Sequence, residues 1–384
     1  MIDLDPKKDA GPVITEAIKR LAERQTATPD GVYLGGGVLR LPAGVFRSSM
    51  PISLTPQLAS GHHAGHITLT GQGRLATVLI FDNGIDGLVG ADFHGINADC
   101  QTRITDLGVY GHGKQGVRFL GGGSCVVDRV LVSGFEELIA FDCQDTSRIR
   151  DCSLYEGGIG VAMRNDTNGA VVEGCQFNGP AICISHEGGV GQIVRDCNSE
   201  SGVLARVRSG QNLIHENWLH ETRGEVPAFH FDDQGSPNIV PTAIGFTIRG
   251  GFIGGTKIVR VDPKAAVYHF AWDDASASGA LGAVVDNAGY LAGQTTVIGR
   301  KPPVPMFARE LDELHDLDEL GTAAYVPNNP RGNAPVLPAK ARPGALAFAW
   351  HGRKQGEGPG QGTGVPVYFS GVWRVVGTDL PVAT

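Results

Sequence analysis

A repeat of about 22 residues constrains this chain more than any other feature of its sequence. Six consecutive segments begin at residues 102, 124, 146, 167, 190 and 211, which gives spacings of 22, 22, 21, 23 and 21 residues. A steady period in this range indicates stacked supersecondary units, because one unit of this size cannot bury its own apolar face. A leucine-rich repeat is excluded, since its LxxLxLxxN pattern is absent.

Each segment contains two short strands separated by a polar, glycine-rich turn. In the second strand apolar and polar residues alternate, and a period of two places one face in the core and the other in solvent. Coils stacked in parallel, about 4.8 Å apart, would bury the apolar residues in columns, so we predict an all-β fold, a single-stranded parallel β-helix. The two expected inward columns are Leu107, Val130, Cys152, Cys175, Cys197 and Asn217, and Phe119, Phe141, Met163, Ile184, Val207 and Phe231.

The composition is that of a folded protein and limits its partners. The chain has 384 residues, of which 41% are hydrophobic and 19% charged, and its net charge of −8 argues against a dominant nucleic-acid surface. No apolar run reaches transmembrane length, and the first residues, MIDLDPKKDAGP, do not form a signal peptide. We therefore expect synthesis in the cytoplasm without membrane insertion, which leaves open a non-classical export route or a leader removed earlier.

The cysteines fit a packing role better than a disulfide or metal role. Three of the seven fall in one predicted inward column, and buried free cysteine packs as a small apolar residue. No CxxC pair occurs, and the odd number fits free thiols. The seven are Cys100, Cys125, Cys143, Cys152, Cys175, Cys183 and Cys197.

The first 83 residues carry a family resemblance. Residues 11–25 place Ile14, Ile18 and Leu21 on one helical face, which we expect to cap the open end of the β-helix. LPAGVFRSSMPISL (41–54) and HITLTGQG (66–73) follow. This order of helix, turn and strands resembles the start of the pectate-lyase-like right-handed parallel β-helix superfamily, which includes phage tailspikes. The resemblance implies a right-handed coil and a polysaccharide as ligand, and in phage particles it implies a homotrimer.

Four segments are expected along the chain: a capping segment (1–65), the β-helix (66–300), a proline-rich linker with an acidic helix (301–342) and a small C-terminal β-module (343–384). The last segment, with ALAFAW, PVYF and VWRVV, resembles the terminal β-module of phage and prophage structural proteins. That resemblance implies proteins of a phage-like tail or particle as partners, and a place in a virion or phage-derived particle that acts outside the cell.

Stacking converts the repeat into a candidate site, because outward residues one coil apart lie about 5 Å apart. Two adjacent outward columns are predicted, and they place Asp232 beside Asp262 with Arg208 and His230 as their neighbours. A carboxyl pair at this spacing would suit a retaining glycosidase, in which one member has a raised pKa. Alternatively, arginine and histidine would neutralise a uronate and abstract its C5 proton, as in a lyase. The columns are Arg206, His230 and Arg260, and Arg208, Asp232 and Asp262.

We therefore predict Asp232, Asp262 and His230 as catalytic residues and the three arginines as substrate-binding residues. A simpler interpretation stays open, because outward ion-pair ladders also occur as solvated contacts that stabilise little. A second predicted sugar-binding patch contains Trp218, His220 and Trp272, since aromatic rings stack on sugar faces, although the same residues could plug the end of the helix.

No cofactor or metal is expected. The HHAGH segment (62–66) offers three histidines on a glycine-rich loop without a fourth ligand, and the calcium-binding aspartates, the RxPxxR-type motif and the DPHD motif of related enzymes are absent. Two functions remain open at this level. The chain either binds and cleaves a bacterial surface polysaccharide, or binds a glycan as a structural component of a phage-like particle without turnover.

Overall fold

The structure is a computed structural model that describes most of the chain. The described residues are 2–27, 33–56, 65–90, 101–200, 202–221, 226–238, 240–255, 257–278, 285–287, 289–292, 296–298, 346–349, 365–369 and 373–375. The predicted acidic helix at 309–321, its proline-rich linker, Cys100 and the first three residues of HHAGH lie outside them. None of the helical structure within the described residues has the length and apolar character that a membrane crossing requires.

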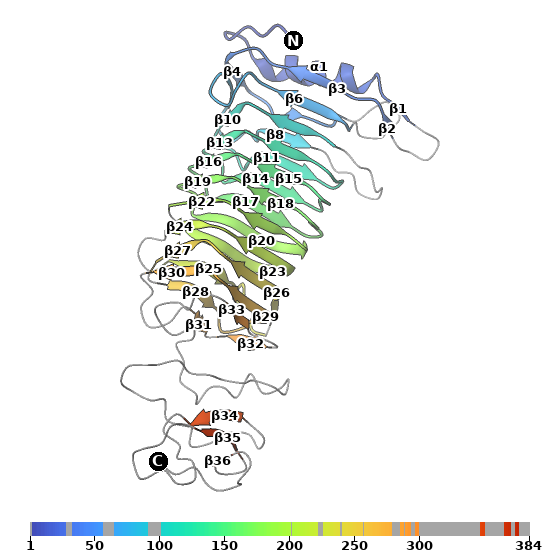
Figure 1. Ribbon diagram of the computed structural model, residues 1–384. Coiled ribbons are helices and arrows are strands. Elements are labelled where there is room, and N and C mark those ends of the chain that lie inside the picture. The colour runs from blue at the N-terminus through green and yellow to red at the C-terminus, as the bar shows by residue number, and fades with distance from the viewer. Residues whose placement is uncertain are drawn as a thin grey trace.

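The predicted right-handed parallel β-helix is confirmed, and its coils stack along one axis (Figure 1). One coil runs through β9 (Arg103–Thr105), β10 (Gly108–Tyr110) and β11 (Gln115–Leu120). The next coil repeats it in register, with Ile104 beside Val127 and Val117 beside Ile139. Parallel pairing between equivalent strands is what a repeated coil of constant length must produce.

One face of the β-helix is a ten-stranded parallel sheet to which each coil contributes one strand. Its strands are β4 (Gly44–Ser48), β7 (Thr77–Phe81), β10, β13 (Leu131–Ser133), β16 (Ser153–Tyr155), β19 (Gln176–Asn178), β22 (Asn198–Ser199), β24 (Leu219–Glu221), β27 (Phe252–Gly254) and β30 (Ser276–Ser278).

The other two faces share a 21-stranded sheet, because long strands such as β23 (Val203–Glu216) pass round the corner between them. Its other strands are β3 (Gly37–Arg40), β5 (Ile52–Ser53), β6 (Ile67–Thr70), β8 (Leu88–Gly90), β9, β11, β12 (Val126–Asp128), β14 (Glu137–Asp142), β15 (Arg148–Arg150), β17 (Ile159–Arg164), β18 (Val171–Glu173), β20 (Ile182–Val190), β21 (Ile193–Arg195), β25 (Pro227–Phe231), β26 (Val240–Arg249), β28 (Lys257–Val261), β29 (Ala265–Asp273), β31 (Val285–Asn287), β32 (Tyr290–Ala292) and β33 (Thr296–Ile298).

The bend between the first two strands of a coil uses one left-handed residue, repeated from coil to coil. Asp106 has φ 57°, and its equivalents Arg129, Asp151 and Asp196 have φ between 52° and 54°. Gly174 takes the same conformation at φ 63°, where glycine carries no steric cost. The stacked bends turn the chain at one height in every coil and so keep the inward columns aligned.

The inward columns form one continuous core, and the cysteine ladder is part of it. Cys152, Cys175 and Cys197 are free thiols with at most 2% of their surface exposed, as the packing interpretation predicted. Each side chain points at carbonyls of its own and the preceding coil, for example Cys152 Sγ at 3.2 Å from Arg150 O. Burial raises the pKa of Cys152 well above its ordinary value, so this thiol is neutral.

The predicted columns are wrong in two coils. In the fourth coil Ile184, not Ile182, pairs with Val161, so the inward place next to Met163 belongs to His186. In the sixth coil Asn217 is exposed with φ 50°. Trp218 takes the inward place that we predicted for Asn217. Both errors arise because a polar or aromatic side chain replaces the aliphatic residue that marks the column elsewhere.

His186 and His215 form a buried pair. His186 Nε2 lies 2.9 Å from His215 Nε2, and His186 Nδ1 lies 2.5 Å from Gln192 Oε1. His215 packs against the rings of Phe229 and Phe246, and its Nδ1 has no hydrogen-bond partner among the described residues. Burial lowers the pKa of His186 to about 4 and that of His215 well below its ordinary value, so both rings are neutral.

The N-terminal end is capped by α1 (Ala10–Ala22), as predicted. The helix begins at Asp9, whose carboxylate accepts a hydrogen bond from Gly11 N at 3.0 Å. Ile14 and Ile18 are fully buried against the first coil, whereas Val13 on the outer face is 45% exposed. Near the C-terminus β34 (Leu346–Ala349), β35 (Val365–Phe369) and β36 (Trp373–Val375) form the small antiparallel sheet of the predicted terminal β-module.

We predict that Ile18→Ala destabilises the protein by about 2–5 kcal/mol, because it leaves a cavity between α1 and the coil that it covers. Val13→Ala is the control on the same helix, since Val13 is half exposed, and it should change stability by less than about 0.5 kcal/mol. Chemical denaturation followed by circular dichroism measures both. Equal effects of the two substitutions would contradict a tightly packed cap.

The buried histidines predict a pH dependence of stability. Their pKa values are depressed in the folded state, so the unfolded chain binds more protons between about pH 4 and pH 6.5, and the free energy of unfolding falls as the pH falls through this window. His215→Phe should flatten the dependence, and it should cost about 1–3 kcal/mol at pH 7.5, because it leaves His186 Nε2 without its buried partner. Unfolding curves at pH 7.5 and 5 measure this, and an unchanged slope in the variant would contradict it.

Candidate functional site

The predicted outward columns meet near the C-terminal end of the β-helix. Arg206 on β23, His230 on β25 and Arg260 on β28 are direct neighbours in register, as predicted. Asp232 and Asp262 follow the ends of β25 and β28 and lie on the adjacent column. The alternation of each strand puts these side chains outside, because Phe229, Phe231, Val259 and Val261 occupy the core.

The two aspartates take different partners, also as predicted. Arg208 Nε donates to Asp232 Oδ2 at 2.8 Å, whereas Asp262 Oδ2 lies 2.9 Å from His230 Nε2. Arg260 Nε donates to the other oxygen of Asp262 at 2.9 Å. Only 11% of the Asp262 side chain is exposed, against 47% of Arg260, so the carboxylate lies beneath the Arg260 guanidinium.

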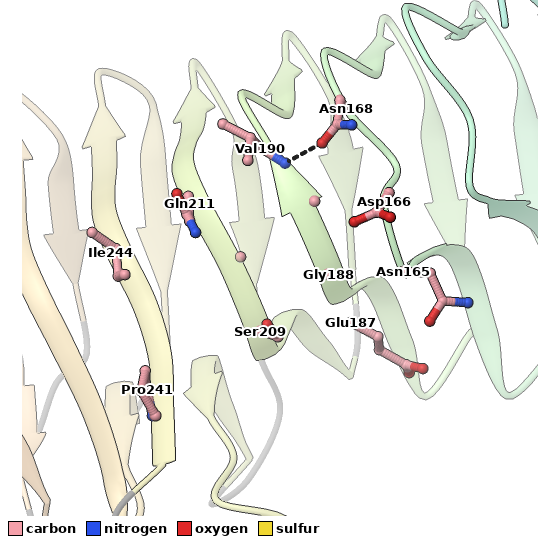
Figure 2. A pocket seen from close by; sticks show the side chains of 12 residues that line it. Asn165, Asp166, Asn168, Glu187, Gly188, Val190, Ser209, Gln211, Pro241 and Ile244 are labelled. Atoms are coloured by element: carbon pink, nitrogen blue, oxygen red, sulfur yellow. Dashed lines mark hydrogen bonds between the residues drawn. The ribbon is translucent and has the colours of Figure 1, made fainter. Parts of the chain in front are cut away.

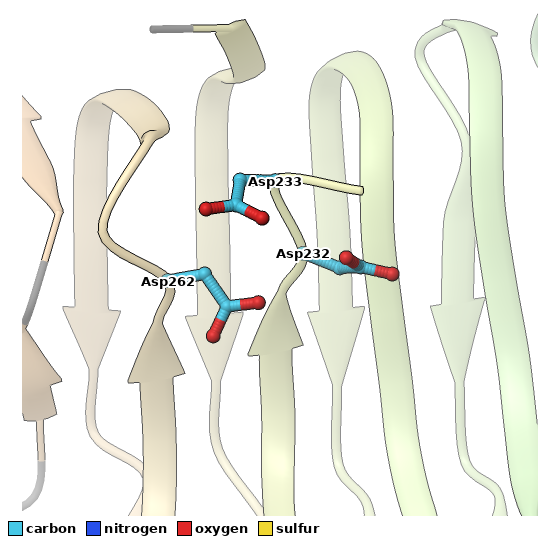
Figure 3. Close-up of side chains that lie close together, drawn as sticks. All are labelled: Asp232, Asp233 and Asp262. Carbon is cyan, nitrogen blue, oxygen red and sulfur yellow. The ribbon is translucent and has the colours of Figure 1, made fainter. Parts of the chain in front are cut away.

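Asp233 belongs to the same site, although no repeat pattern singles it out. One carboxylate oxygen from each of Asp232, Asp233 and Asp262 lies within 4.8 Å of the other two. Figure 3 shows that Asp233 and Asp262 direct their carboxylates into the same space, while Asp232 points the other way. Asp233 stands in the loop after β25, which has no equivalent in the preceding coil, and this is why periodicity could not find it.

The three carboxylates are compensated by the protein itself. Gln234 N donates to Asp232, and Gly235 N and Lys264 N donate to the two oxygens of Asp233, at distances between 2.7 and 3.0 Å. With the side-chain contacts above, each of the six oxygens has a hydrogen-bonding partner. A cation would have to share these oxygens with several donors, so the donor set fits an ion-pair network better than a metal site.

Glu187 extends the site by one coil beyond Arg206 and was missed as a central residue. It accepts hydrogen bonds from Arg164 Nε at 3.1 Å, Arg206 Nη2 at 3.0 Å and Ser185 Oγ at 2.8 Å. Its place became visible only with the true register of β20, where His186 turns inward and Glu187 outward. The cluster of Glu187, Arg206, Arg208, His230, Asp232, Asp233, Arg260 and Asp262 is called the charged cluster below.

Asp232 and Glu187 in the charged cluster have lowered pKa values and stay ionised. Burial would raise the pKa of Asp232, but the hydrogen bonds and charge of Arg208 and Gln234 N hold it below its ordinary value. Burial acts in the same direction on Glu187, and Ser185, Arg164 and Arg206 together lower its pKa below the ordinary value. Within the predicted pair, Asp232 is therefore the ionised member.

A groove runs from the charged cluster across the corner of the β-helix. It has a volume of about 400 Å³ and crosses β20, β23 and β26, with Glu187 at one edge (Figure 2). Asn165, Asn168 and Gln211 supply amides, and Asn168 also accepts a hydrogen bond from Val190 N at 3.0 Å. The groove exists because the chain passes this corner as continuous β20 and β23, with register shifts between them, where earlier coils have tight turns.

The predicted exposed aromatic patch is wrong, because the structure buries all three of its residues. Trp218 is 2% exposed and stacks on Phe177, and Trp272 is fully buried with its Nε1 donating to Ala275 O at 2.9 Å. His220 is also fully buried, and its Nδ1 lies 2.5 Å from Ser199 Oγ. All three side chains are part of the packed interior, so none of them is available to a ligand.

Solved structures resemble this chain, whereas no match to it was found at the level of sequence families. No family model and no curated protein matches the chain. Among solved structures, the alginate lyase from Paenibacillus sp. str. FPU-7 is 17% identical, with 77% of this chain and 95% of that chain covered and a TM-score of 0.47. The tailspike protein gp49 from Pseudomonas phage LKA1 is 14% identical, with 72% of this chain and 51% of that chain covered and a TM-score of 0.49.

The tailspike protein of E. coli bacteriophage HK620 is 13% identical, with 80% of this chain and 63% of that chain covered and a TM-score of 0.45. This chain thus spans about half to two thirds of the length of the two tailspike structures. At these identities the similarity concerns the fold alone. The class that the fold defines is the right-handed parallel β-helix protein.

We predict that Arg208→Gln raises the pKa of Asp232 toward its ordinary value, because it removes the guanidinium that holds the carboxylate ionised. A carboxyl-carbon NMR titration measures this pKa directly. Arg260→Gln is the matched control, since its Nε contacts Asp262, and it should leave Asp232 nearly unchanged. Equal shifts in both variants would show that only the overall charge of the face matters.

Proposed function

We propose that the charged cluster binds an acidic bacterial surface polysaccharide and cleaves it. The observation that carries this proposal is the contact between His230 Nε2 and Asp262 Oδ2 on an outward face, flanked in register by Arg206 and Arg260. A histidine oriented by a carboxylate is an established arrangement for proton transfer near neutral pH. Flanking guanidinium groups suit the carboxylate of a uronate.

The proposed step is a β-elimination. Asp262 holds Nε2 of His230, so the other ring nitrogen, Nδ1, would accept the C5 proton of the uronate. Arg206 or Arg260 would neutralise the sugar carboxylate and thereby stabilise the negative charge that develops as this proton leaves. The electrons of the C5–H bond form the C4–C5 double bond, the C4–O bond breaks, and the leaving oxygen takes a proton from solvent or from the protonated histidine.

Hydrolysis by two carboxyl groups is the second catalytic candidate. The distances within 4.8 Å between oxygens of Asp262, Asp232 and Asp233 support it, because a retaining mechanism needs two carboxyl groups near 5 Å. The lowered pKa of Asp232 argues against this residue as the proton donor. In a hydrolase Asp232 would therefore be the ionised partner of the pair.

A binding protein without turnover is favoured by a different observation. All six oxygens of the three aspartates already have partners, which is what a stabilising ion-pair network would show. In that case the face and the groove beside it would recognise a glycan as part of a phage-like particle. We propose for either function that the chain acts outside the cell as a homotrimer in a virion or phage-derived particle, as the terminal sequence resemblances suggest.

The test incubates the purified protein with bacterial capsules, exopolysaccharides and uronate polymers, and follows new reducing ends together with the absorbance of unsaturated uronate. We expect His230→Gln and Asp262→Asn each to lower kcat at least about 100-fold, the lower range of general acid–base contributions. Asp273→Asn is the control, because its carboxylate pairs with Arg249 outside the cluster, and it should retain activity.

The outcomes separate the candidates. Reducing ends with unsaturated products would establish the elimination, and reducing ends alone would establish hydrolysis. Binding of a glycan by wild type and variants alike, with no cleavage of any polymer, would overturn the catalytic proposal and leave recognition.

A further inference from the structure

Two arginines on an earlier part of the β-helix stand apart from the charged cluster. Arg103 on β9 and Arg148 on β15 point outward on the same column of the first strands, and Val126 on β12 lies between them in register. Both arginines are exposed. They are two coils apart, so their Cα atoms are separated by about 10 Å.

Their lack of partners distinguishes them from the neighbouring column. There, Arg150 pairs with Asp128, Arg195 with Glu173 and Arg249 with Glu216, at N–O distances between 2.7 and 3.0 Å. Acidic and basic residues alternate along this column, so each forms an ion pair with the neighbouring coil. Arg103 and Arg148, by contrast, make no ion pair or side-chain hydrogen bond with the part of the chain that the structure describes.

The two guanidinium groups line a hollow that offers further hydrogen-bonding groups. Its volume is about 350 Å³, and its wall includes the hydroxyls of Ser124 and Thr146, which lie 3.2 Å apart. Ser124, Thr146 and Gln101 repeat at the coil corner with positive φ, so their side chains stack along the axis. The hollow is lined by Gln101, Arg103, Ser124, Val126, Thr146, Arg148 and Arg150.

We propose that this hollow is a second glycan-binding site, which takes an acidic polysaccharide with a carboxylate or sulfate on alternate sugars. A guanidinium without a protein partner binds such groups as a fork of N–H donors. The separation of about 10 Å set by two coils is roughly the length of a disaccharide. The apolar side chain of Val126 lies where the uncharged sugar of each pair would sit, and the hydroxyls of Ser124 and Thr146 are suited to sugar hydroxyls.

A nucleic acid fits the same hollow less well. The lining contains no aromatic side chain on which bases could stack, and two cations at this spacing do not match the closer phosphates of a strand. The net charge of −8 also opposes a dense polyanion more than a sparsely charged one.

This site goes beyond the proposed function and does not depend on it. The hollow lies on the coils of β9, β12 and β15, and the His230 contact lies three coils beyond that of Arg148, on another face of the helix. A variant of the charged cluster should leave binding at the hollow unchanged, so the failure of either proposal can be recognised separately.

The test measures binding of a hyaluronan octasaccharide, which has one carboxylate per disaccharide, to the full-length protein by isothermal titration at low ionic strength. To exclude turnover and to weaken binding at the cluster, the background is the His230→Gln/Arg206→Gln/Arg260→Gln variant, which lacks the proposed base and both flanking guanidinium groups. We expect Arg103→Gln/Arg148→Gln to weaken binding at least tenfold. Arg195→Gln/Arg249→Gln removes the same charge from the neighbouring column and should change the affinity less than twofold.

Equal weakening by both double variants, or no weakening by the first, would overturn the site. So would an Arg103- and Arg148-dependent affinity for single-stranded DNA that exceeds the affinity for the octasaccharide. Val126→Arg adds a third guanidinium halfway along the column. It should improve binding of an octagalacturonate, with a carboxylate on every sugar, more than binding of the hyaluronan octasaccharide, and the opposite order would contradict the spacing argument.

Discussion

The structure depends on parallel pairing of each coil with the next at a rise of about 4.8 Å. Because this pairing is in register, every side chain meets its equivalent from the neighbouring coil. Inside, the consequence is continuous columns of apolar side chains such as Phe119, Phe141 and Met163. Outside, like charges in one column would repel one another. Acidic and basic residues therefore alternate along the column, as in Glu173, Arg195 and Glu216.

The candidate sites lie where this regularity is relaxed. Continuous β20 and β23, with register shifts between them, replace the tight corner of earlier coils and open the groove beside Glu187. The same region holds the buried pair of His186 and His215, whose neutral rings substitute for aliphatic side chains. At the earlier hollow the departure is in charge, because Arg103 and Arg148 stand in a column whose other members are uncharged.

Periodicity in the sequence predicts much of the fold and part of the candidate site, and particular residues show where such a prediction fails. The repeat predicted the fold, the cysteine ladder and the neighbourhood of Arg206, His230 and Arg260, and helical spacing in residues 11–25 predicted the capping helix. It failed at Ile182–Val190, because apolar residues alternate there in a way that satisfies two registers separated by two residues, and Ile184 was given the inward place that His186 occupies. It could not find Asp233, since an inserted loop has no equivalent from which to infer a position.

The sequence by itself determined the coil length, the inward columns and the capped end, because these follow from local alternation and from a period that any stacked coil must keep. Only the tertiary structure decided which way the polar and aromatic exceptions face. His186 turns inward because Gln192 and His215 from later in the chain offer it hydrogen-bonding partners, and the inward ring of Trp218 stacks on Phe177 from an earlier coil. Such partners belong to other coils, so no local pattern contains them.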